Sequence, residues 1–156
     1  IKNRIQAISL IHEMLYQEKD KAHLDLKSYF TQLINYLILS HSQSKQVNYQ
    51  ILIEEISISI DQCITCGLIA AEILTNSLKH AFSDTPKPEI LFSIKKTSNT
   101  NVAIIISDNG KGIDLSKIEK NNTLGLDLVK KMAQKIDAKT NFVNNHGTTF
   151  TLEFPI

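Results

Sequence analysis

The sequence predicts an α+β protein in which a two-helix antiparallel hairpin precedes a two-layer α/β sandwich. Apolar residues recur at helical spacing over residues 1–37, and short β-branched runs follow from Val47. Two further helical patterns separate those runs, and several runs alternate apolar with polar residues. When one face of a sheet is exposed to solvent, helices pack against the other face, and the protein then has two layers.

The composition is that of a folded domain of ordinary size. The chain has 156 residues, of which 42% are hydrophobic and 21% charged, and this excludes collagen-like and disordered classes. Seventeen basic residues balance sixteen acidic ones, which argues against broad binding of nucleic acid or an anionic membrane driven by net charge and leaves a local basic site open. Apolar runs such as residues 102–106 are only strand-sized. We therefore expect a cytoplasmic, soluble piece of a longer protein.

The hairpin is predicted from two apolar stripes. The first is a heptad seam of Ile1, Ile5, Ile8, His12 and Leu15, and the second is made by Leu26, Phe30, Leu33 and Leu37. A short polar link joins them, so the helices should run antiparallel. Residues 1–46 are assigned to this hairpin and 47–156 to the sandwich. The exposed apolar face should pair with a second copy in a four-helix bundle; alternatively, it covers the rest of the chain.

The sandwich is predicted to contain five strands and two helices. The strands are expected at 55–60, 89–95, 102–108, 140–144 and 148–154, and the helices at 63–82 and 124–136. In the last strand Phe150, Leu152 and Phe154 alternate with polar residues, so one face should be buried.

A lone C-x-x-C, Cys63 and Cys66, opens the first of these helices. A zinc site would need two more ligands, and none is nearby. A redox pair after a strand is the alternative. The favoured interpretation is two small buried hydrophobic residues in a reducing compartment.

The same helix carries a polar stripe. Glu72, Asn76 and His80 are spaced four apart and share one face. A merely solvated helix face would explain any charged stripe, but Asn is a poor choice there because its side chain competes for backbone bonds. The stripe is therefore a candidate site.

Glycine turns supply two more candidate elements. Asp108-Asn109-Gly110-Lys111-Gly112 directly follows an apolar strand, and its glycines allow positive φ and close approach of a ligand. Leu124-Gly125-Leu126 opens the next helix, where free N–H groups and the helix dipole suit phosphate. Neither a Walker loop nor a dinucleotide fingerprint is present.

In order, these pieces resemble the N, G1 and G2 boxes of the sensor histidine kinase ATP-binding domain, which has the Bergerat fold also found in gyrase-type ATPases. The resemblance covers about residues 50–156, including the closing Gly147-Thr148-Thr149-Phe150. Residues 1–8 resemble the dimerisation helix of the subfamily with an H-R-[IV]-K-N phosphoacceptor motif. In that alignment the phosphorylated histidine lies two positions before Ile1, and His12 is a packed or bundle-facing residue, not a replacement for it.

The resemblance implies Mg²⁺ and ATP as cofactor and substrate. Asn76 would hold the metal, and Asp108 would accept a hydrogen bond from the adenine amino group. Lys79 and His80 would lie near the phosphates, with Glu72 orienting or polarising a water.

It also implies seven further nucleotide-binding positions in turns, at a helix start and in the last strand: Gly110, Gly112, Leu124, Gly125, Leu126, Thr148 and Thr149. The first two glycines would hinge a lid over residues 111–123, Gly125 would let the helix start approach the phosphates, and the two threonines would lie near the base.

The implied activity is transfer of the γ-phosphoryl of ATP to the upstream histidine and then to a response-regulator receiver domain. The hairpin would form the homodimer, and this piece alone would bind ATP or ADP without autophosphorylation. The alternative is a nucleotide-gated switch of the anti-sigma kind, which generally lacks such a helical front. A gyrase-type ATPase would need a longer lid and a following transducer domain.

Overall fold

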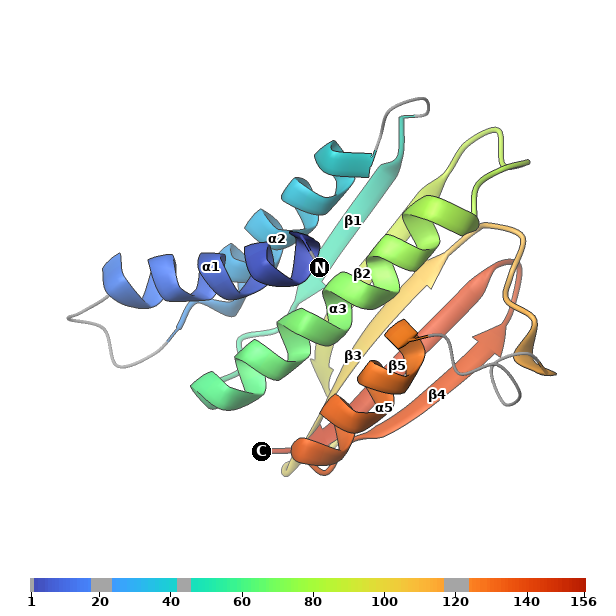
Figure 1. Cartoon of the computed structure of the whole chain (residues 1–156). Coiled ribbons are helices and arrows are strands. Elements are labelled where there is room, and N and C mark those ends of the chain that lie inside the picture. The colour runs from blue at the N-terminus through green and yellow to red at the C-terminus, as the bar shows by residue number, and fades with distance from the viewer. Residues whose placement is uncertain (1, 18–23, 42–45, 117–123) are drawn as a thin grey trace.

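The computed structural model describes residues 2–17, 24–41, 46–116 and 124–156 (Figure 1). These residues form a five-stranded sheet with helices packed on one face. In chain order the elements are α1 (Lys2–Gln17), α2 (Leu26–His41), β1 (Asn48–Ile53), α3 (Ile60–His80), β2 (Glu89–Lys96), β3 (Asn101–Asp108), α5 (Leu124–Lys135), β4 (Lys139–Asn144) and β5 (Thr148–Pro155). The predicted α+β sandwich preceded by two helices is confirmed.

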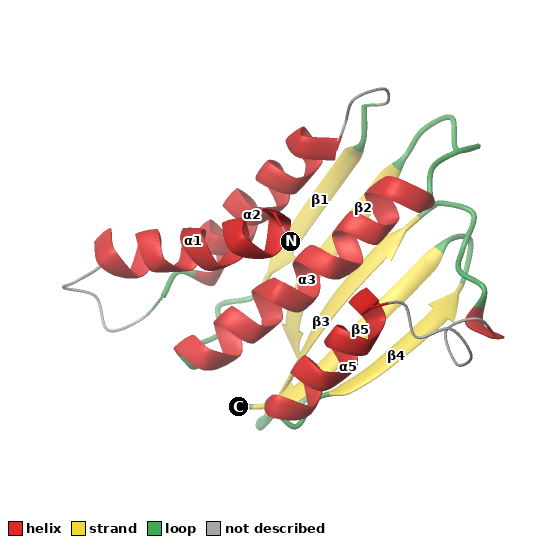
Figure 2. Cartoon of the chain, in the orientation of Figure 1, coloured by secondary structure: helices red, strands yellow, loops and turns green. Residues whose placement is uncertain are grey.

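The sheet has the order β1-β2-β3-β5-β4, with β1 and β2 parallel and the other pairs antiparallel. Alternate residues of the strands face α3 and α5, which lie on the same face of the sheet (Figure 2). Phe92, Ile104 and Phe150 are among the buried residues on that face. The opposite face has no helix over it in the described part of the chain, and polar side chains alternate along it.

One predicted strand is wrong. Residues 55–60 form an irregular segment, and the first strand is β1, at 48–53, where it pairs with β2 from Asn48↔Glu89 onward. The alternation of Ile and Ser that predicted a strand lies beyond the end of β1. There the Glu54 side chain, and not a strand backbone, accepts a hydrogen bond from Lys96 N–H of β2 (2.8 Å). Ile56 and Ile58 still pack against the core from this segment.

α3 begins where the sequence supplies a capping box. Ser59 Oγ accepts from Gln62 N–H (3.1 Å), and the Gln62 side chain accepts from Ser59 N–H (3.0 Å). Helix formation therefore starts directly after the irregular segment. α3 continues for 21 residues to His80, which carries its polar stripe to the end of the sheet where β2 begins and β3 ends.

The two N-terminal helices, α1 and α2, run in roughly opposite directions (Figure 1). The apolar stripe of α2 is not exposed to solvent. Its apolar residues are buried in the same core as the sheet, and the Phe30 and Phe92 ring centroids lie 5.0 Å apart. For α2 this favours the alternative in which the hairpin covers the rest of the chain. α1 packs outside, where Ile5 is 59% exposed. His12 is also exposed, so within this single chain it is not packed, and the bundle-facing alternative stays a prediction.

Tyr29 joins α2 to α3. Its ring is fully buried, and its hydroxyl lies where a side chain on Gly67 would be; none of the residues that the structure describes gives this hydroxyl a hydrogen-bond partner. Cys63 and Cys66 are free and buried, as predicted. Burial raises the pKa of Cys63 to about 12 and raises the pKa of Cys66 as well.

Two kinds of feature are absent from the described ranges. They contain no group of three or more His, Cys, Asp or Glu side chains that could hold a metal ion by themselves. No helix in these same ranges has both the length and the apolar composition to cross a bilayer.

Candidate functional site

A cavity of about 700 Å³ lies between the second half of α3, the turn after β3, the start of α5, the second half of β4 and the start of β5. Its size is in the range of small-ligand sites. The predicted residues that line it are Glu72, Asn76, His80, Asp108, Gly112, Gly125, Leu126 and Thr148. Segments far apart in the chain thus meet at one place.

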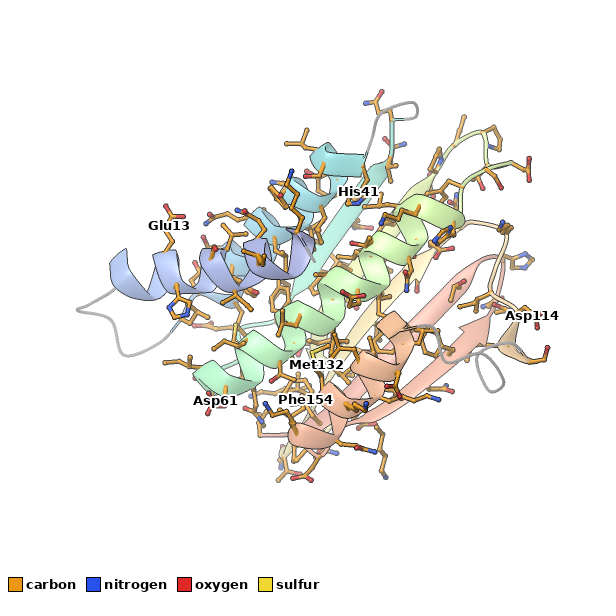
Figure 3. The ribbon with its side chains drawn as sticks, in the orientation of Figure 1. Glu13, His41, Asp61, Asp114, Met132 and Phe154 are labelled. Atoms are coloured by element: carbon orange, nitrogen blue, oxygen red, sulfur yellow. The ribbon has the colours of Figure 1, made fainter. Side chains whose placement is uncertain are left out.

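The polar stripe of α3 forms one wall of the cavity. Glu72 and Asn76 are half-buried, and His80 is exposed at the end of the helix. Lys79 is exposed and is not among the lining residues. Asp61, in the first turn of α3, lies at the far end of the molecule from Asp114, which lines the cavity (Figure 3).

Asp108 is the most enclosed acidic side chain of the site. It is only 8% exposed, and its carboxylate accepts three hydrogen bonds. Ser77 Oγ donates to Oδ2 (2.7 Å), and Gly110 N–H (3.0 Å) and Thr148 N–H (3.2 Å) donate to Oδ1. A carboxylate offers about four acceptor positions, so these three bonds leave Asp108, which lines the cavity, with capacity for one more donor.

Ser77 is a site residue that the motif analysis gave no role. It is buried, one position after Asn76, and this turns its hydroxyl from the polar stripe toward the sheet and Asp108. The signal that could have identified it is a small polar residue on the sheet-facing side of an otherwise apolar helix. Phe142 and Ile73, also missed, add apolar walls to the cavity.

Two glycines of the site are explained by close packing. A Cβ on Gly110 would lie 2.4 Å from Ala81 O at the end of α3, and Lys111 N–H donates to the same oxygen (3.0 Å). Gly110 therefore packs against α3 and does not line the cavity. A Cβ on Gly125 would lie 2.9 Å from Glu72 Oε2, so this glycine lets the start of α5 approach that carboxylate.

Thr148 and Thr149 point to opposite faces of the sheet because successive strand residues alternate. Thr148 lines the cavity, whereas Thr149 Oγ1 lies 2.9 Å from Ser107 Oγ on the open face. The expectation that Thr149 lies near the base therefore does not fit its placement. Leu124 begins α5, but its side chain lies outside the described residues, as do positions 117–123 of the expected lid.

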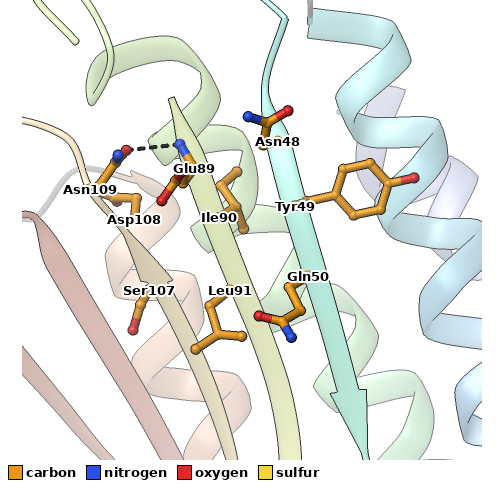
Figure 4. A pocket seen from close by; sticks show the side chains of 9 residues that line it. All are labelled: Asn48, Tyr49, Gln50, Glu89, Ile90, Leu91, Ser107, Asp108 and Asn109. Carbon is orange, nitrogen blue, oxygen red and sulfur yellow. Dashed lines mark hydrogen bonds between the residues drawn. The ribbon is translucent and has the colours of Figure 1, made fainter. Parts of the chain in front are cut away.

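A second, more open hollow of about 380 Å³ lies on the helix-free face, where β1 and β2 begin and β3 ends (Figure 4). Asn109 closes one side of it, with Glu89 N–H donating to Asn109 Oδ1 (2.8 Å) and Asn109 Nδ2 donating to Lys87 O (2.9 Å). This hollow has neither the polar stripe nor the start of α5. We therefore place the candidate site in the larger cavity.

Comparison with known proteins agrees with this architecture. A family model described as histidine kinase-, DNA gyrase B-, and HSP90-like ATPase matches residues 64–156. A second model, described as histidine kinase, matches residues 1–41. Together they confirm the resemblance to sensor histidine kinases.

Among curated proteins, the chain is similar to blue-light-activated histidine kinase 2 of Erythrobacter litoralis (strain HTCC2594), at 24% identity over 168 aligned positions. The match covers all of this chain but 46% of the relative, so the chain spans about half of that protein.

Solved structures share the fold. The histidine kinase domain of the Erythrobacter litoralis EL346 blue-light-activated kinase superposes with a TM-score of 0.87 at 21% identity, over 99% of this chain and 73% of that one. Full-length ShkA in complex with AMPPNP superposes with a TM-score of 0.67 at 15% identity, over 86% of this chain and 30% of that one. Because the matched model covers more than half of the chain, the protein belongs to the family of histidine kinase-, DNA gyrase B- and HSP90-like ATPases.

Proposed function

We propose that the large cavity binds Mg²⁺ and ATP, and that the intact protein transfers the γ-phosphoryl of ATP to a histidine preceding Ile1 and then to a response-regulator receiver domain. One observation carries the nucleotide assignment: the buried Asp108 carboxylate, held by three donors, faces a cavity that also contains Asn76 and the start of α5. Family membership implies ATP binding, and the ShkA complex shows an ATP analogue bound to a protein of similar fold.

Asp108 suits adenine because it is an acceptor. An adenine amino group can donate to the remaining acceptor position, whereas guanine presents an oxygen at the corresponding place and would be repelled. Ile73, Leu126 and Phe142 supply apolar surface for the ring. The site should therefore prefer ATP to GTP.

Other parts of the cavity lining suit phosphates. His80 and Lys111 line the cavity, and so does the start of α5, where the N–H groups of a helix N-terminus favour an anion. The donor set also fits magnesium, since Asn76 offers an amide oxygen and Mg²⁺ takes its other ligands from phosphates and water. The metal would neutralise charge on the phosphates. Glu72 lies on the same stripe, one turn before Asn76, where its carboxylate can orient a water.

The hairpin favours a kinase over a nucleotide-gated switch of the anti-sigma kind, because residues 1–41 match a histidine kinase model. We also propose a cytoplasmic homodimer, as expected for such a kinase. Since the stripe of α2 is buried, the dimer would use α1, where Ile5 and Ile8 are exposed. Light scattering of the parent chain and of Ile5→Lys tests this: a dimer that Ile5→Lys dissociates is expected, and a monomeric parent would contradict it.

Calorimetric binding of AMPPNP with Mg²⁺ tests the pocket. Asp108→Asn and Asn76→Ala should each weaken binding by roughly 5- to 150-fold, since a lost hydrogen bond in an enclosed site costs about 1 to 3 kcal/mol. Asn48→Ala, in the hollow on the open face, is the matched control and should bind as the parent does. Parent-like affinity of both site variants would refute the assignment.

Phosphotransfer is tested separately. A longer chain that includes the expected upstream histidine should become labelled by γ-³²P-ATP with acid-labile phosphate, while its Asn76→Ala variant should not. A folded, nucleotide-binding longer chain without any phosphohistidine would favour the switch.

A further inference from the structure

The cavity wall between α3 and β4 is an irregular segment that is fixed at two points. On one side Lys111 N–H donates to Ala81 O at the end of α3 (3.0 Å). On the other side Ile113 makes two hydrogen bonds with the side chain of Asn144: Ile113 N–H donates to Oδ1 (3.0 Å), and Asn144 Nδ2 donates to Ile113 O (2.6 Å). Lys111 and Ile113 both line the cavity, so these hydrogen bonds fix the position of this part of the cavity wall.

Asn144 is well placed for this task. It is the last residue of β4, and alternate strand residues share a face, so it follows Phe142 on the side of the cavity. It pairs with Thr148 of β5, whose N–H donates to Asp108. Asn144 therefore links the irregular wall to the strand pair that supports the acceptor carboxylate.

Gly112 makes room for the amide. It has a φ of +80°, and a Cβ on it would lie 3.1 Å from Asn144 Oδ1 and 3.3 Å from Cγ. Glycine thus allows both the turn between the two fixed points and the close approach of the carboxamide.

We propose that Asn144 is a positioning residue for nucleotide binding: its carboxamide holds Ile113, and through it the wall formed by residues 111–113, against the bound nucleotide. The inference rests on the proposed function. A carboxamide both donates and accepts, so it can pair with both polar groups of one backbone residue; aspartate keeps only the acceptor, and alanine keeps neither.

The experiment compares the parent with Asn144→Ala, Asn144→Asp and a matched control, Asn141→Ala. Asn141 is exposed on the same strand but on the opposite face. Two measurements are made on each protein: the dissociation constant of AMPPNP with Mg²⁺ by calorimetry, and hydrogen exchange of the Ile113 amide without nucleotide. Circular dichroism checks that each variant is folded.

Asn144→Ala should raise the dissociation constant about tenfold and speed exchange at Ile113 by a similar factor, as expected for the loss of one or two hydrogen bonds. Asn144→Asp should weaken binding but leave the Ile113 amide protected, because its acceptor remains. Asn141→Ala should match the parent within about twofold in both measurements, since its side chain lies away from the wall. If Asn144→Ala does not fold, the aspartate variant carries the test.

Two results separate the hypotheses. If the parent fails to bind the nucleotide, the proposed function is overturned, while exchange at Ile113 still reports whether Asn144 holds the wall. If the parent binds and Asn144→Ala binds equally well, the positioning role is overturned whether or not exchange changes.

Discussion

Replacement of Gly67 by alanine should destabilise the protein, although alanine is the better helix former by about 1 kcal/mol. The added Cβ would lie 1.9 Å from Tyr29 Oη and 2.9 Å from Tyr29 Cζ. Both distances are too short for non-bonded atoms, and the ring is fully buried on the other side. α2 must therefore move away from α3.

The expected magnitude follows from two opposing terms. Overpacking of a core costs about 1 to 3 kcal/mol, and a contact this short should lie at or above the upper end. Subtracting the gain in helix propensity leaves a net loss of about 2 kcal/mol. Tyr29→Phe should behave oppositely: it removes a buried hydroxyl that has no hydrogen-bond partner in the described part of the chain, so it should raise the free energy of unfolding by about 1 kcal/mol.

The assay is a double-mutant cycle by urea unfolding, monitored by circular dichroism. In the Tyr29→Phe background the contact with Oη is gone but the 2.9 Å approach to Cζ remains, so Gly67→Ala should cost about 1 kcal/mol less than in the parent. Additive effects, or a Gly67→Ala variant as stable as the parent, would refute the packing of α2 against α3 described above.

Three further predictions concern other parts of the fold. Gly147→Ala should cost about 3 kcal/mol in urea unfolding, because φ is +127° and a Cβ would lie 1.9 Å from Asp108 O; unchanged stability would contradict this contact. The Cys63 thiol ionises near 9 when exposed, whereas burial raises its pKa to about 12. The contribution of Cys63 to stability should therefore be full below pH 9 and be lost at about 1.4 kcal/mol per pH unit between about pH 9 and 12, so Cys63→Ala should reduce the slope of the pH dependence by about that amount. Lys131→Ala should change the unfolding free energy by less than about 0.5 kcal/mol, since the bridge from Lys131 to Asp127 (2.9 Å) is largely exposed; a larger loss would show that solvent does not screen it.

Most of the fold could be predicted because its elements have clear periods. The polar–apolar alternation of Phe150, Leu152 and Phe154 correctly placed the last strand. The same rule failed at residues 55–60, where Ser59 belongs to a capping box and not to a strand. Local alternation cannot reveal which segment finds a partner, and β1 exists because β2 is available for parallel pairing.

The site was less predictable than the fold. Helical spacing placed Glu72, Asn76 and His80 together on one wall, since that depends only on the helix. The bonds of Ser77 to Asp108 and of Asn144 to Ile113 each join residues 31 positions apart, so no local pattern could indicate them. To predict such tertiary contacts, one must know the register in which the strands pair.

The shared core of α2 and the sheet affects how this protein can be divided. A cut at the composition boundary near Gln46 would remove Phe30 from Phe92 and strip an apolar layer from β1 and α3. A fragment of residues 47–156 would expose a large apolar surface and should aggregate. The whole chain, by contrast, should unfold in a single cooperative transition. The helical segment that the change in composition marks as separable is thus an integral part of the core of the sheet domain.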